Sequence, residues 1–75
     1  MLISGLLLEM QDGKIKEVLH AIKKINGLEV TEEFPENKLG LVLESKNTQQ
    51  AVDACNKINS LPQITNLSLV YYRYV

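Results

Sequence analysis

The sequence predicts an α+β fold in which a four-stranded antiparallel sheet carries two helices on one face. Three observations support this prediction. Four segments have the apolar or alternating composition of strands, and two repeat apolar residues at helical spacing. These segments follow one another in the order strand, helix, strand, strand, helix, strand. A chain of 75 residues has the length of one domain, which we place over residues 1–75.

The first half of the chain reads as strand, turn and helix. Residues 2–10, LISGLLLEM, are apolar at nearly every position, which is typical of a central strand. Asp12 follows in a turn and is a candidate N-cap for a helix over residues 14–26. Asn26-Gly27 is a helix stop signal. The apolar face of this helix is formed by Ile15, Val18, Leu19, Ile22 and Ile25.

The second half begins with a strand, a turn and a return strand. Residues 28–34 alternate like an edge strand, residues 35–38 form a turn, and residues 39–44 are again apolar at both parities apart from Gly40.

A second helix is expected over residues 47–60, capped by Asn47 or Thr48 and ended by Pro62. Its buried stripe is predicted to comprise Ala51, Val52, Ala54, Cys55, Ile58 and Leu61. Residues 63–73 form the last strand.

Two βαβ halves with short connections close most simply into a ferredoxin-like βαββαβ sheet. In this topology the first and third strands are central, and these are the two strands that are apolar at both parities. The closing segment SLVYYRYV, residues 68–75, holds all three tyrosines. It is therefore predicted to pair with the first strand.

Strand alternation assigns residues to the two faces of the sheet. The turn at 35–38 should place Phe34 opposite Leu39, so that both lie under the helices. The helix-covered face is then Leu2, Leu6, Leu8, Leu28, Val30, Phe34, Leu39, Leu41, Leu43, Leu67, Leu69 and Tyr71. The open face is Ile3, Gly5, Leu7, Glu9, Glu29, Thr31, Glu33, Gly40, Val42, Glu44, Ser68, Val70 and Tyr72.

The open face is predicted to be a shallow apolar trough with an acidic rim. Gly5 and Gly40 leave its centre low, four glutamates surround it, and no lysine or arginine is expected there before Arg73. Such a surface suits a ligand that is partly apolar and partly cationic. The same pattern also fits a homodimer that packs sheet on sheet, or apolar surface residues without a function.

Composition and charge exclude several classes of protein. With 45% hydrophobic and 23% charged residues the chain is globular, and its net charge of −1 argues against a nucleic-acid partner. A single cysteine excludes an internal disulfide and fits a reducing compartment. MLISGLLLEM lacks the basic start of a signal peptide, and no apolar run approaches the ~18 residues of a membrane span. We expect a cytoplasmic protein.

Catalytic and cofactor sites are not predicted. His20 falls on the polar side of the first helix, and Cys55 reads as a small buried hydrophobe. The loop at 11–14 has neither the arginine of ferredoxin-like acylphosphatases nor the paired cysteines of metal-carrying domains. The central strands lack the stacking aromatics of RNA-recognition motifs. We therefore expect no enzyme activity, no cofactor and no metal.

Four short pieces resemble one family. These are Ile3-Ser4-Gly5-Leu6, Gly27 with Glu29-Val30, Leu43-Glu44, and Ser68-Leu69-Val70-Tyr71. In this order they are similar to the NapD family, the assembly chaperones of periplasmic nitrate reductase. The resemblance covers nearly the whole chain, although relatives continue past the last strand with a polar tail and this chain ends at Val75.

The resemblance implies a cytoplasmic, non-enzymatic protein without a cofactor. It would bind the twin-arginine signal peptide of the nitrate reductase catalytic subunit precursor and hold back export until cofactor insertion is complete. No nucleic acid or membrane span is implied, and a weak homodimer stays open. The signal-peptide-binding residues expected on the open face are Ile3, Gly5, Leu7, Glu9, Val42, Glu44, Ser68, Val70 and Tyr72.

Two other functions fit the same order of elements. One is an ACT-like regulatory module that binds a small molecule as a dimer, which requires a tight oligomer that sedimentation would detect. The other is a degenerate acylphosphatase, which would require measurable hydrolysis of an acyl phosphate.

Overall fold

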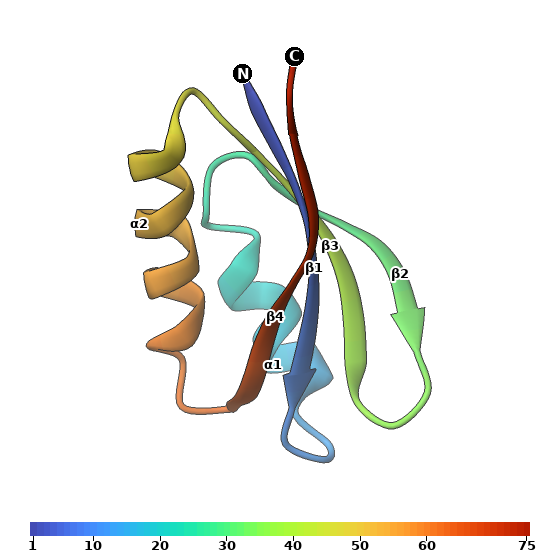
Figure 1. Cartoon of the computed structure of the whole chain (residues 1–75). Helices are drawn as coiled ribbons and strands as arrows, with labels where there is room; N and C mark the ends of the chain where they lie inside the picture. Colours follow the sequence, from blue (N-terminus) through green and yellow to red (C-terminus); the bar gives the residue numbers. More distant parts are fainter.

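Four antiparallel strands form one sheet in the order β2-β3-β1-β4, and both helices lie on the same face of it (Figure 1). The computed structural model describes all 75 residues. The elements are β1 (Leu2–Met10), α1 (Ile15–Ile22), β2 (Leu28–Phe34), β3 (Lys38–Ser45), α2 (Thr48–Asn59) and β4 (Ile64–Tyr74). The predicted ferredoxin-like fold, with β1 and β3 in the centre, is confirmed.

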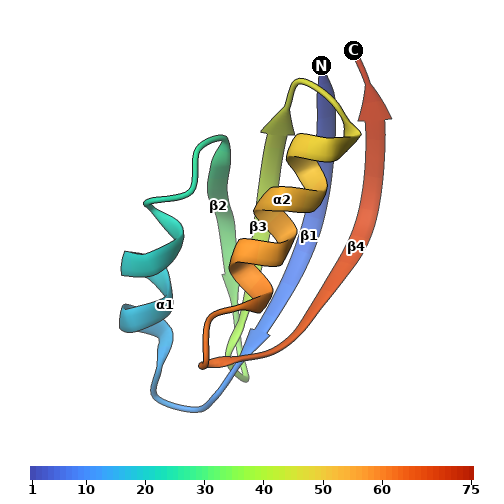
Figure 2. The same ribbon diagram turned by 90° about the vertical axis from the view of Figure 1, so that its left-hand side faces the viewer.

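The hydrophobic core lies between the sheet and the two helices. Every second residue of β1 and β3 points into it, which is the period expected of a strand with one face on a core. Figure 2 shows the helices side by side over this face, with α2 over β1 and β4 at the free edge. The buried core residues are Leu2, Leu6, Leu8, Met10, Val18, Ile22, Leu39, Leu41, Leu43, Ala51, Ala54 and Ile58.

The closing segment pairs with β1, as predicted, apart from Val70, which has no partner on β1. β4 runs antiparallel to β1 from Ile64 to Tyr74. Beyond the strand, the Val75 amide donates to the Met1 carbonyl at 2.9 Å, and the Met1 amino group donates to the Val75 carbonyl at 2.9 Å. The ends of β1 and β4 therefore stabilise each other.

The start of α2 confirms Asn47 as its N-cap. The Gln50 amide donates to Asn47 Oδ1 at 2.9 Å, and the Lys46 amide donates to Gln50 Oε1 at 2.9 Å. Two amides at the helix start thus gain acceptors from side chains. Within the predicted buried stripe Val52 is an exception, because it is 45% exposed.

The start of α1 differs from the prediction. Its N-cap position is Lys14, which makes no side-chain capping bond. Gly13 bends the chain with φ 75°, so Asp12 lies two residues too early to reach the helix amides, and its Oδ1 accepts instead from Asn37 Nδ2 at 3.2 Å. The prediction that Asp12 caps this helix is wrong.

The end of α1 also comes earlier than predicted, at Ile22. The next amides bond three residues back, from Lys24 to the Ala21 carbonyl and from Ile25 to the Ile22 carbonyl, which tightens the chain into turns. Gly27 then leads into β2 with φ 82°. A Cβ at this position would collide with the Glu44 carbonyl oxygen, so a larger residue does not fit.

Candidate functional site

The face of the sheet opposite the helices is the candidate functional site. On the central strands the predicted faces are confirmed, because Ile3, Leu7 and Val42 alternate with residues of the core. Residues paired across antiparallel strands share a face. The pairs across β1 and β3 on this side are Ile3 with Glu44, Gly5 with Val42, Leu7 with Gly40, and Glu9 with Lys38.

A β-bulge at Val70 changes the face assignment on β4. Leu69 pairs with Leu6 and Tyr71 pairs with Gly5, so Val70 is an extra residue between them. Because one extra residue inverts the alternation, Tyr71 faces the open side and Tyr72 turns towards the helices. The prediction that Tyr72 lies on the open face and Tyr71 under the helices is wrong. The other eight predicted binding residues lie on the open face.

A second bulge, at Thr31, has the same effect on β2. Val30 pairs with Leu41 but Glu32 pairs with Gly40, so Thr31 has no partner. Glu33 is then paired with the core residue Leu39 on the helix side, whereas Phe34 lies on the open face. The predictions for Phe34 and Glu33 are therefore both wrong.

Aromatic rings cover the two glycines on this face. A Cβ at Gly5 would overlap the Tyr71 ring, and a Cβ at Gly40 would lie 3.3 Å from Phe34 Cε2. The predicted hollow centre is thus filled by these rings. A shallow depression of about 400 Å³ remains, lined by Gly5, Leu6, Leu7, Thr31, Phe34, Gly40, Leu41, Val42, Val70 and Tyr71.

Phe34 and Tyr71 are residues of the open face that the sequence pattern placed under the helices. Each glycine lies opposite a bulge on the neighbouring edge strand, and in each case an aromatic residue on that strand covers it. Aromatic residues often cover a glycine across a sheet in this way. The single glycine in each central strand is the sequence feature that could have predicted an aromatic residue covering it from the neighbouring strand.

Charge is unevenly distributed over the open face. Glu9 lies 3.9 Å from Lys38 Nζ and accepts from Asn66 Nδ2 at 3.0 Å. Lys38 therefore lies on this face, contrary to the prediction of no lysine. Glu29 and Glu44 make no ion pair. They are diagonal neighbours on β2 and β3, which corresponds to about 7–8 Å between them.

The open face thus has an acidic half and an apolar half. Free carboxylates lie over β2 and β3, at Glu29, Glu32 and Glu44. On β4, Val70 and Tyr71 are 64% and 48% exposed, and the bulge also places Arg73, the partner of Ile3, on the open face near the end of the strand. Such a surface can bind a segment that carries cations next to apolar residues.

The groups with catalytic potential are not brought together. His20 is exposed on α1, and burial raises the pKa of the Cys55 thiol on α2. No group of three or more histidine, cysteine, aspartate or glutamate side chains is arranged to hold a metal ion. None of the helices has the length and apolar character needed to traverse a lipid bilayer.

Comparison with known proteins extends this description. Among solved structures, the solution structure of the E. coli Tat proofreading chaperone protein NapD matches with a TM-score of 0.85 over 97% of this chain and 78% of that chain, at 18% sequence identity. An uncharacterized NIPSNAP domain protein from Burkholderia xenovorans matches with a TM-score of 0.53 over 100% of this chain and 94% of that chain, at 11% identity. No curated protein matches the sequence.

The two structural matches show a shared fold. The family model described as NapD protein matches residues 1–74, which is nearly the whole chain. The protein therefore belongs to the NapD family.

Proposed function

We propose that this protein is a cytoplasmic chaperone that binds a twin-arginine signal peptide through the open face of its sheet. The client would be the precursor of the periplasmic nitrate reductase catalytic subunit, held back from export until cofactor insertion is complete. One observation carries the proposal: an acidic half and an apolar half adjoin on one uncovered face. Membership of the NapD family supports the same function.

The chemistry of the ligand matches the two halves of the face. A twin-arginine signal peptide has two adjacent cations followed by an apolar stretch. Glu29 and Glu44, as unpaired diagonal neighbours, suit the two arginines. Leu7, Val42 and Val70 suit the apolar stretch. The chaperone acts by occupying the signal, so no catalytic step is required.

The two kinds of contact have different roles. An exposed ion pair contributes about 0–1 kcal/mol, whereas full burial of one aliphatic side chain contributes about 1.5–3 kcal/mol. Apolar contacts therefore provide most of the affinity, and the glutamates orient the peptide and speed its approach.

Peptide titration followed by NMR tests the binding face. A twin-arginine peptide added to the labelled protein should shift the amide resonances of β1, β3 and β4 around the depression. The control is a peptide with both arginines replaced by glutamine, which should bind more weakly at the same face. Shifts confined to α1 and α2 would contradict the proposal.

Substitutions separate the apolar contribution from the charged one. Leu7→Asp or Val42→Asp should weaken peptide binding by about tenfold or more, because each places a charge where the apolar stretch lies. Glu44→Gln should weaken it only a few-fold, and Glu9→Gln least, because Glu9 already contacts Lys38 and Asn66. Isothermal titration calorimetry measures the affinities, and circular dichroism confirms folding. If Glu44→Gln weakened binding more than Leu7→Asp or Val42→Asp, an interface dominated by apolar contacts would be ruled out.

A further inference from the structure

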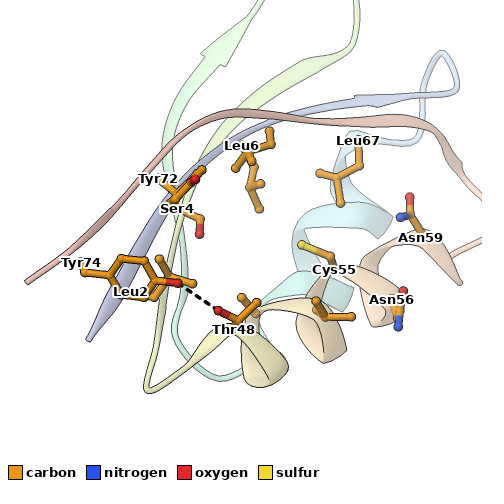
Figure 3. Close-up of a pocket in the computed structure, with 13 residues that line it drawn as sticks. Leu2, Ser4, Leu6, Thr48, Cys55, Asn56, Asn59, Leu67, Tyr72 and Tyr74 are labelled. Atoms are coloured by element: carbon orange, nitrogen blue, oxygen red, sulfur yellow. Dashed lines mark hydrogen bonds between the residues drawn. The ribbon is translucent and has the colours of Figure 1, made fainter.

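A second hollow lies on the other face of the sheet, between α2 and the β1–β4 pair (Figure 3). We call it the α2–β4 cleft. It has a volume of about 460 Å³, within the range of pockets that bind small ligands or side chains. Thirteen residues line it, including Leu6, Cys55, Leu69 and Tyr72, and none of the thirteen is charged.

The bulge at Val70 and the small residues of α2 create this cleft. Because of the bulge, Tyr72 and Tyr74 turn towards the helix side, and the Tyr74 hydroxyl is hydrogen-bonded to Thr48 Oγ1 at 3.0 Å (Figure 3). On the facing side of α2, Ala51 is too short to fill the space. The cleft is therefore a consequence of how β4 and α2 are built.

A hydroxyl group points into the cleft. Ser4 is only 5% exposed, and its Oγ is directed into the hollow in Figure 3. The side-chain hydrogen bonds of the protein do not include it. The only fully buried polar side-chain atom without a hydrogen-bond partner is Ser45 Oγ. The Ser4 hydroxyl is therefore accessible from the cleft, where the backbone of a bound peptide can form a hydrogen bond with it.

An exposed apolar band connects the cleft with the open face. At the mouth of the cleft, Val52, Leu69 and Tyr72 are 45%, 58% and 61% exposed. On the other side of β4, Val70 and Tyr71 continue the band onto the open face. β4 is an edge strand, so nothing in the fold separates the two surfaces. Contiguous exposed apolar surface usually marks an interaction site.

We infer that the apolar stretch of the signal peptide continues from the open face around β4 and places a side chain in the α2–β4 cleft. This inference rests on the proposed function and adds a second subsite to it. An uncharged cleft suits the apolar stretch and excludes the arginines, which stay near the glutamates of β2 and β3.

The length of the ligand permits this path. An apolar stretch of about 7–15 residues spans about 10–22 Å even as a helix, and neighbouring strands are only about 4.8 Å apart. The stretch is therefore long enough to contact Val70 on one side of β4 and Tyr72 on the other.

Cys55, the only cysteine, lies in the wall of the cleft and serves as a reporter. The rate of Cys55 alkylation by iodoacetamide is measured by mass spectrometry without peptide and with a full twin-arginine peptide. A third sample contains a shorter peptide that keeps the arginines but lacks the apolar stretch. Burial raises the pKa of this thiol, so the reaction is run at alkaline pH. The control is the variant Cys55→Ala, Lys57→Cys, whose cysteine lies on α2 outside the cleft.

The full peptide should slow alkylation of Cys55 at least tenfold, and the shorter peptide should bind without slowing it. The control cysteine at position 57 should react at the same rate in all samples. Binding of the full peptide without protection of Cys55 overturns this inference and leaves the proposed function standing. No binding by either peptide overturns both. If Cys55 becomes protected as the protein concentration rises with no peptide present, the cleft binds a second copy of the chain. That outcome also overturns the inference.

Substitutions at the mouth of the cleft give an independent test. Val52→Thr is nearly isosteric at an exposed position and removes apolar contact without adding charge. Val75→Thr makes the same change at a residue outside the cleft. Val52→Thr should weaken binding of the full peptide several-fold and leave binding of the shorter peptide unchanged. Val75→Thr should leave binding of both peptides unchanged. Equal affinities of the two variants for the full peptide would contradict the inference.

Discussion

At the scale of single residues, the two glycines of the central strands differ in how tightly they are covered. At Gly5 a methyl group would overlap the Tyr71 ring, whereas at Gly40 the nearest atoms would be Thr31 Oγ1 at 3.2 Å and Phe34 Cε2 at 3.3 Å. The first contact requires a ring to move, and the second requires a shift of a few tenths of an ångström. The same substitution should therefore have different consequences at the two sites.

We predict that Gly5→Ala lowers the free energy of unfolding by about 1–3 kcal/mol, as overpacking does. Gly40→Ala should change it by less than about 1 kcal/mol, because alanine also restricts the unfolded chain and offsets the close contact. Urea denaturation of both variants measures the difference. If Gly40→Ala lowered the free energy of unfolding more than Gly5→Ala, the close contact at Gly5 would be relieved by free movement of the Tyr71 ring.

At the scale of the elements, local pattern determined most of the fold but not the face of every residue. The bounds of β1 and β2 were predicted correctly, because strand composition and the flanking turn residues are local. The faces on β1 and β3 were also correct. On β2 and β4 the predicted faces assume strict alternation through Thr31 and Val70. Each bulge lies beside a residue that is paired with a glycine of the neighbouring strand, and the pattern of a single strand does not include this pairing.

The two helix starts provide a matched test of capping. Asn47 accepts a hydrogen bond from the Gln50 amide, whereas Asp12 caps nothing and bonds to Asn37 in an exposed turn. Asn47→Ala should lower the free energy of unfolding by about 1 kcal/mol, and Asp12→Ala by less than about 0.5 kcal/mol. For a domain of this size the first corresponds to a fall in Tm of about 4–8 °C. Equal shifts in Tm would contradict the assigned caps.

At the scale of the whole molecule, a net charge of −1 conceals a separation of charge. Lys14, Lys16, Lys23 and Lys24 gather in and around α1 on the helix side, whereas the unpaired glutamates of the open face lie on β2 and β3. A cationic peptide is therefore attracted to one side of the molecule and repelled by the other. Steering of this kind raises the association rate more than it raises affinity.

Glu29 and Glu33 separate this directional effect from net charge alone. Both lie on β2, about 13 Å apart along the strand, but Glu29 faces the open side and Glu33 the helix side because of the bulge between them. Each change to glutamine raises the net charge by one. In stopped-flow measurements at low salt, Glu29→Gln should slow peptide association about two- to fivefold. Glu33→Gln should slow it by less than half as much. At 0.5 M salt the difference should vanish, because the screening length falls to about 4 Å. Equal slowing by both variants would show that only net charge steers the peptide.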